Sequence, residues 1–129
     1  QIFMLQAEVV ERMVAKAGSS DFSRLSVMLQ ARYDMDLVLE VPPEAFEPKP
    51  KVNSAVVRMI PRKDFNLSDA QWHSLEQVVA AAFSQRRKIL RTNLQAFAER
   101  LSLTELELKA RAQDIAVERY IEWAKVLAS

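Results

Sequence analysis

The feature that most constrains the fold is a proline-rich segment, residues 42–52, which lies between two strand-like runs. Proline lacks a backbone N–H and fixes φ, so four prolines in nine residues hold this segment extended and outside a sheet ladder. The flanking runs MDLVLEV (35–41) and NSAVVRMI (53–60) have the length and the aliphatic, β-branched composition of strands. An eleven-residue connection without a helical pattern is too long for a tight hairpin, and such loops often carry function.

Apolar residues at helical spacing predict two helices before the first strand. The spacing predicts a helix over residues 2–16, with Gly18 as the residue that ends it. A second helix is expected to begin at a cap on Ser20 or Asp21 and to run to about Tyr33. The apolar residues that define the first helix are Ile2, Leu5, Val9, Val10 and Met13.

After Pro61 the pattern becomes helical to the end of the chain. Ser68 and Gln71 have the form of a capping box, and Thr104 and Glu107 repeat that form. Further apolar stripes predict a helix over residues 86–99 and a last helix from Val117 to the C-terminus.

The composition excludes several classes of function. The 129 residues include no cysteine, which excludes disulfides and thiolate metal sites and favours a cytoplasmic location. Only Gly18 is a glycine, where an average usage of about 7% predicts roughly nine, so a glycine-rich cofactor loop is not expected. No apolar run approaches the ~20 residues that span a bilayer. The only histidine, His73, has no evident partner, so we expect no catalytic, metal or cofactor site in this chain.

The sequence QRRKILR holds four cations and no acid, although the net charge of the chain is only +1. On the expected helix 86–99, Arg87 and Arg91 share a face and Lys88 lies one step round. Such a cluster can contact several RNA phosphates, and each contact adds salt-dependent affinity. The alternative is a solvated face, but acidic partners four residues away are missing. The candidate RNA-binding residues here are Arg86, Arg87, Lys88 and Arg91.

A second basic cluster surrounds the proline-rich segment and includes one aromatic ring. Its cations, which only Glu47 opposes in the sequence, are Lys49, Lys51, Arg58, Arg62 and Lys63. A rigid extended backbone with Lys49 and Lys51 near Phe46 suits an RNA strand whose base has turned out of its stack. The alternative, which composition slightly favours, is that Phe46 fills the core beneath the loop.

Several segments together resemble the ribosomal RNA adenine N6-dimethyltransferase family, whose bacterial type is the kasugamycin-resistance enzyme. The most specific is F-x-P-x-P-x-V-x-S, preceded by VPP and followed by AVVR: here Phe46, Pro48, Pro50, Val52 and Ser54. The segments FMLQAEVVERMVA (3–15), RLSVMLQ (24–30) and FSQRRKILRTNL (83–94) agree with the family. The tail RAQDIAVERYIEWAKVL (111–127) departs from the family's R-A-E-x-L-S-V-E pattern at Gln113 and at Ala116, where a capping serine is usual. The resemblance covers essentially the whole chain.

The resemblance implies the fold class and the domains. This chain would be the C-terminal portion of such a protein, following a Rossmann-like domain that binds S-adenosylmethionine upstream. Residues 1–63 would be an α/β remnant, with the two antiparallel strands at one end of a seven-stranded methyltransferase sheet. Residues 64–129 would form a small all-α domain that binds rRNA.

The resemblance also implies the reaction. S-adenosylmethionine would supply methyl groups to the N6 atoms of two adjacent adenines near the 3′ end of small-subunit (16S) rRNA, during ribosome biogenesis. Phe46 would be a candidate contact to the target adenine, and the two basic clusters would hold the rRNA of the 30S particle. Because the cofactor site would lie upstream, we expect the 129-residue chain alone to be inactive.

Two other functions remain open: a non-catalytic RNA- or ribosome-binding module, and a structural interaction domain. No membrane partner is expected. In the implied arrangement, strand 53–60 would have one unpaired edge and helix 2–16 would lose the sheet face that it covers. Unpaired edges and exposed apolar faces recruit other chains, so we expect the isolated chain to self-associate.

Overall fold

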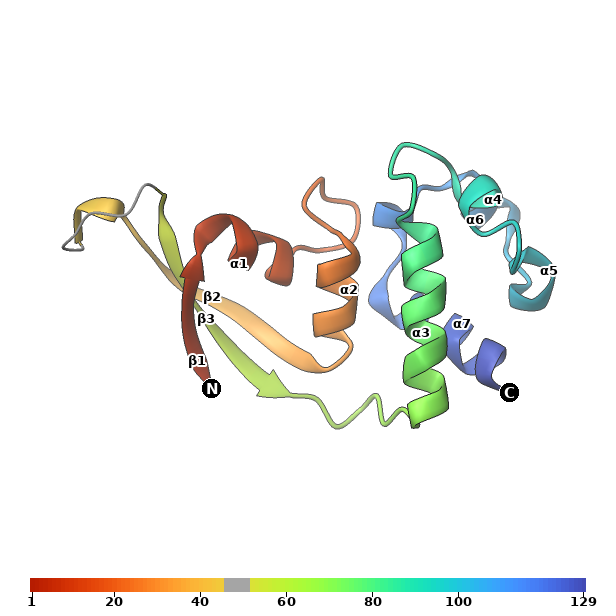
Figure 1. The fold of residues 1–129 in the computed structure, drawn as a ribbon, viewed down its shortest axis with the longest axis horizontal. Helices are drawn as coiled ribbons and strands as arrows, with labels where there is room; N and C mark the ends of the chain where they lie inside the picture. The colour runs from red at the N-terminus through yellow and green to blue at the C-terminus, as the bar shows by residue number, and fades with distance from the viewer. Residues whose placement is uncertain (46–51) are drawn as a thin grey trace.

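The computed structural model describes residues 1–45 and 52–129. The predictions made for Phe46, Pro48, Lys49, Pro50 and Lys51 lie outside these described residues. The elements are β1 (Ile2–Gln6), α1 (Ala7–Val14), α2 (Arg24–Gln30), β2 (Tyr33–Val41), η1 (Pro43–Ala45), β3 (Ser54–Pro61), α3 (Asp69–Ala82), α4 (Leu90–Asn93), α5 (Ala98–Leu101), α6 (Glu105–Lys109), η2 (Ala112–Asp114) and α7 (Val117–Ala128) (Figure 1).

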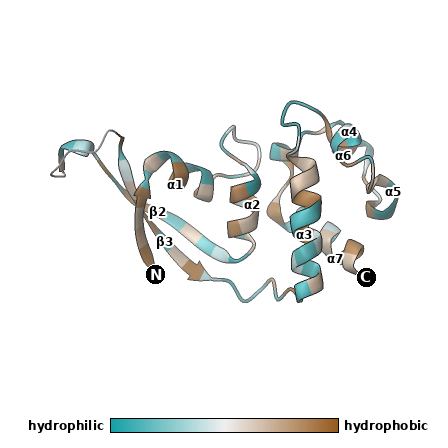
Figure 2. Ribbon diagram, viewed as in Figure 1, coloured by the Kyte–Doolittle hydropathy of each residue, from teal (hydrophilic) through white to brown (hydrophobic). Residues whose placement is uncertain are grey.

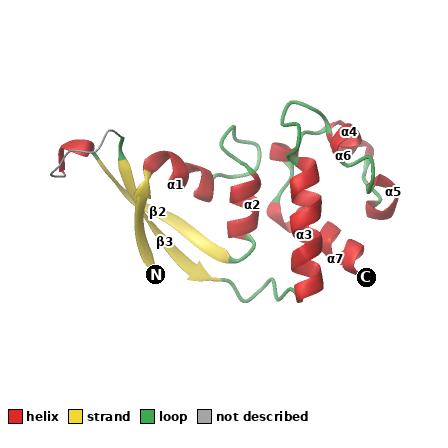
Figure 3. Ribbon diagram, in the orientation of Figure 1, coloured by secondary structure: helices red, strands yellow, loops and turns green. Residues whose placement is uncertain are grey.

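The strands form one antiparallel sheet in the order β1-β3-β2, at the end of the molecule that holds α1 and α2 (Figure 3). Met4 of β1 pairs with Val56 of β3, and β2 pairs along the other side of β3 with a bulge between Leu37 and Leu39. The two predicted strands are therefore confirmed as an antiparallel pair, each within two residues of its expected ends.

The prediction of a helix over residues 2–16 is wrong in its first part. Residues Ile2–Gln6 form strand β1, and the helix α1 covers only Ala7–Val14. The apolar spacing in such a short stretch is compatible with a helix and with a strand. Residues 2–6 form a strand because they pair with the edge of β3. The expected open edge of β3 is also wrong, because β3 is the middle strand. Within the described residues, β1 has no strand on its outer side.

Two hydrophobic cores hold the elements together. The smaller one packs α1 on the sheet and contains Val10, Met13 and Val57. The larger one joins α2 to α3 and α7; Phe22 and Trp123 are both buried in it. This core contains residues from both sides of the predicted domain boundary between residues 63 and 64. The division into two domains stays a prediction.

The predicted capping boxes at Ser68–Gln71 and Thr104–Glu107 are both present, and each starts a helix. The second helix instead begins after a cap on Ser23, because the side chains of Ser23 and Ser26 complete that box. The last helix, α7, begins at Val117 without a side-chain cap, in agreement with the alanine at position 116.

The predicted helix over residues 86–99 is wrong. The chain leaves α3 at Ala82, runs through a loop, and forms only the short helices α4 and α5. Leu90 N–H donates to the carbonyl of Ala110 at 2.8 Å, which takes this backbone into a non-local contact instead of a helical turn. Among the described residues, no helix is long and apolar enough to cross a membrane.

Candidate nucleic-acid interface

A basic loop, defined here as residues 85–88, follows α3 and carries Arg86, Arg87 and Lys88. The hydroxyl of Ser84 donates to the carbonyl of Ala81 at 2.6 Å, where α3 ends. From α4, the Nδ2 of Asn93 donates to the carbonyls of Ala82 and Gln85, both at 2.9 Å. These bonds satisfy carbonyls at the helix end and fix the path of the loop.

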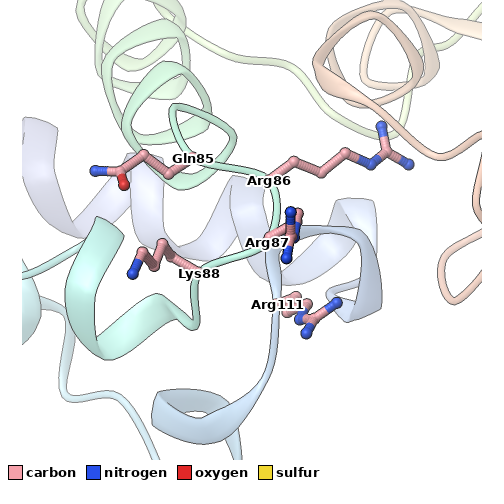
Figure 4. A pocket seen from close by; sticks show the side chains of 5 residues that line it. All are labelled: Gln85, Arg86, Arg87, Lys88 and Arg111. Atoms are coloured by element: carbon pink, nitrogen blue, oxygen red, sulfur yellow. The ribbon is translucent and has the colours of Figure 1, made fainter.

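Arg111 reaches the same place from a distant part of the sequence. An antiparallel bridge pairs Ile89 with Arg111, directly after the basic loop. The two segments enclose an open pocket of about 580 Å³, lined by Gln85, Arg86, Arg87, Lys88 and Arg111 (Figure 4). Arg111 was not among the sequence candidates, because only this non-local bridge brings it to the loop.

The charged residues that line this pocket are all cations, although the nearby Asp114 carboxylate accepts from the backbone N–H of Arg111 at 3.1 Å. Its described lining includes four cations and no carboxylate, and Figure 4 shows the side chain of Lys88 pointing away from those of Arg87 and Arg111. Within the described part of the chain, the side chains of Arg87 and Lys88 have no hydrogen bond or ion pair, whereas Arg111 is the residue that precedes η2 and forms a capping box with Asp114. Guanidinium groups form fork-like pairs with phosphate oxygens, so an anion such as a phosphate can stabilise this arrangement.

The other two predicted residues of the first cluster lie differently. Arg91 is on α4, outside the pocket lining, and its Nη2 lies 3.8 Å from Glu105 in an exposed, loose ion pair. Arg86 lines the pocket, but its Nη2 donates to backbone carbonyls of Ser20 and Phe22. The helix face that Arg87 and Arg91 were expected to share does not exist.

Part of the second predicted cluster is neutralised by acids. Arg58 pairs with Asp36 across the sheet at 2.7 Å. Arg62 donates to both oxygens of Asp64, at 3.1 and 2.8 Å, and these bonds hold the pKa of the Asp64 carboxyl below its usual value. The expectation that only Glu47 opposes these cations is therefore wrong.

Two residues of the F-x-P-x-P-x-V-x-S motif, Val52 and Ser54, are among the described residues, where the segment between β2 and β3 leads into β3. Val52 is exposed, and Ser54 is half-buried at the first position of β3, opposite Val41 and Gln6. His73 is exposed in the first turns of α3. Among residues 1–45 and 52–129, no three His, Cys, Asp or Glu side chains gather as a metal site would require.

A family model and the relatives found by sequence comparison both match the whole length of this chain. The family model described as ribosomal RNA adenine dimethylase matches residues 1–129. Proteins named ribosomal RNA small subunit methyltransferase A, from Burkholderia lata and Burkholderia ambifaria, are each 53% identical to this chain over 131 aligned positions. The alignment covers 100% of this chain and 48% of each relative, so the chain spans about half the length of these relatives. A covered share of 48% gives no position along these relatives, so the placement in their C-terminal part stays a prediction.

Two solved structures are similar in fold. A dimethyladenosine transferase from Plasmodium falciparum matches with a TM-score of 0.77 at 20% identity, over 95% of this chain and 54% of that one. The 23S rRNA methyltransferase ErmE matches with a TM-score of 0.63 at 21% identity, over 99% of this chain and 54% of that one. At these identities the likeness concerns the fold alone.

Proposed function

We propose, because this chain belongs to the ribosomal RNA adenine dimethylase family, that it is part of an enzyme that dimethylates adenines of small-subunit rRNA. The predicted resemblance is thereby confirmed at the level of the family. S-adenosylmethionine is the methyl donor that we propose for the whole protein. Its acceptors are the N6 atoms of two adjacent adenines near the 3′ end of the rRNA. An rRNA substrate in the 30S particle also fits the predicted cytoplasmic location.

The contribution that we propose for this chain is to hold the rRNA backbone. The amine at adenine N6 is a poor nucleophile, because its lone pair is conjugated with the ring. An enzyme must therefore turn the base out of its stack and hold the amine in line with the methyl donor. Phosphate contacts fix the register of the RNA for that step. The observation that carries this proposal is the pocket that Arg87, Lys88 and Arg111 line without a carboxylate.

A second RNA contact is proposed for the proline-rich segment, residues 42–52. We propose that Phe46 contacts the target adenine and that Lys49 and Lys51 bind the adjacent RNA backbone, as the family resemblance implies. The helical part, residues 64–129, is the proposed rRNA-binding domain. In the alternative, a non-catalytic RNA-binding module, the same basic pocket binds RNA but the whole protein transfers no methyl groups.

The test is a comparison of two triple variants with the same change in net charge. In the first, Arg87, Lys88 and Arg111 become Gln; in the control, the exposed cations Lys16, Lys109 and Lys125 become Gln. Binding of a small-subunit rRNA fragment is measured as a function of salt concentration. Each lost phosphate contact lowers the slope of log K against log salt by about 0.7 to 0.9, so the first variant should lower it by roughly 2 to 3. An equal loss in both variants would show that only the net charge matters, and would contradict the assignment of the pocket.

A further inference from the structure

Arg86 differs from its neighbours in the basic loop. Its Nη2 donates to the carbonyl of Ser20, 66 residues away in the sequence, and to the carbonyl of Phe22 at 3.4 Å. In Figure 4 its side chain extends away from Arg87 and Arg111, toward the ribbon of the segment before α2. A side chain committed to two carbonyls in this way does not present its Nη2 to an anion beside Arg111.

The segment that Arg86 contacts connects α1 to α2. Gly18, whose φ is +94°, donates its N–H to the carbonyl of Gln113 at 2.7 Å. The side chain of Phe22 is buried, with its ring centroid 6.4 Å from that of Phe83 at the end of α3. The segment is therefore held on one side by the region of η2 and on the other by the region that leads into the basic loop.

The chemistry of arginine suits such a link. Its planar guanidinium offers several N–H donors in a fixed geometry, so it can bond two carbonyls from one direction. A hydrogen bond from a charged donor contributes more to stability than a bond between neutral groups. Both bonds come from the one nitrogen Nη2, so a neutral glutamine amide keeps an NH2 donor but loses the charge and the reach of the longer side chain.

From these contacts we propose that Arg86 is a positioning residue and not a phosphate ligand. It ties the basic loop to the segment before α2, and so keeps Arg87 and Lys88 in the pocket that Arg111 also lines. The tie itself needs no RNA, whereas its consequence for RNA binding rests on the proposed function.

The test compares Arg86→Gln with Arg87→Gln, which is the adjacent residue in the same loop and has the same change in charge. Amide hydrogen exchange is measured in the 129-residue chain without RNA. We expect the amides of Gly18 and Phe22 to lose protection by about tenfold in Arg86→Gln, the low end for a charged hydrogen bond at a partly exposed site. Arg87→Gln should leave them unchanged. Equal protection in the two variants would overturn the proposal.

Two further measurements complete the test. In rRNA binding, Arg86→Gln should weaken affinity without changing the salt slope, while Arg87→Gln lowers the slope by about 0.7 to 0.9. A lowered slope with unchanged exchange in Arg86→Gln would make Arg86 a phosphate ligand and refute the tie. If Arg86→Gln does not fold, Arg86→Met, which removes the charge and every N–H donor of the side chain, replaces it, and wild-type exchange in that variant would also refute the tie. If the wild-type chain does not bind rRNA while the exchange result holds, the proposed function fails and the tie stands.

Discussion

Replacing Phe22 with alanine tests whether the two parts of the chain form one cooperative unit. Phe22 lies just before α2, yet its side chain is fully buried in the core that contains α3 and α7. A row of aromatic contacts continues from it: Phe22 to Phe83 at 6.4 Å, Phe83 to Tyr120 at 6.0 Å and Tyr120 to Trp123 at 5.2 Å between ring centroids. The variant therefore perturbs the helical part from a residue outside it.

The size of the effect follows from the burial of the side chain. A fully buried Phe→Ala substitution costs about 3 to 5 kcal/mol, which includes the cavity and the lost ring contacts. Domains of this size have unfolding free energies of about 5 to 15 kcal/mol, so the loss is roughly a fifth or more of the total. The control is Leu106→Ala, which truncates a side chain that is 83% exposed and should change stability by about 0.5 kcal/mol or less.

Chemical denaturation with two probes measures this effect. Both tryptophans, Trp72 and Trp123, lie after residue 64, so their fluorescence reports on the helical part, while far-UV circular dichroism reports on the whole chain. We expect both transitions to shift together to lower denaturant in Phe22→Ala. A fluorescence transition that stays at its wild-type midpoint, beside an earlier transition by circular dichroism, would refute this reasoning. That result would show that residues 1–63 and 64–129 unfold independently.

Two more predictions concern an ion pair and the sheet edge. Arg119 donates to both oxygens of Glu107, at 2.6 and 3.0 Å, and these bonds lower the pKa of the Glu107 carboxyl. A carboxyl with a lowered folded pKa contributes stability that is complete above its unfolded pKa, about 4.3, and is lost as the pH falls through the folded pKa. Glu107→Gln should cost about 1 kcal/mol at pH 7 and reduce the loss of stability between pH 7 and 3; an unchanged pH dependence by denaturation would contradict this. At the outer edge of β1, Met4→Lys should prevent the self-association that we propose for the 14.7 kDa chain, because a lysine on an edge strand blocks strand pairing. Sedimentation of the wild-type chain as a monomer would contradict the proposed self-association.

Among the described residues, an unpaired strand edge in this sheet belongs to β1 and none belongs to β3, for which the sequence predicted it. The sequence indicated that an apolar strand would remain unpaired on one side, and assigned that edge to β3. In the structure the apolar residues Ile2, Phe3, Met4 and Leu5 form the outer strand and are all exposed, which appears in Figure 2 as brown along β1. The strand edge through which we expect the isolated chain to self-associate is therefore the outer edge of β1 and not an edge of β3.

The sequence by itself determined the features that depend on neighbouring residues. The capping boxes at Ser68 and Thr104 bond a side chain to a backbone N–H three residues away, so their helices could be predicted from residue types alone. The β-branched, aliphatic composition and the length of the run 53–60 likewise predicted β3. Its inward residues Ala55, Val57 and Met59 are buried.

Only the tertiary structure decided the features that depend on partners distant in the sequence. Residues 2–6 are a strand because the edge of β3 offers them hydrogen bonds, although their apolar pattern also fits a helix. The basic residues 86–88 form a loop because Asn93 and the strand-like bridge to Arg111 take up the backbone. The same bridge adds Arg111 to the candidate site, and the carbonyls of Ser20 and Phe22 hold Arg86 aside. Local spacing carries no information about these contacts, since each joins groups that only the fold brings together.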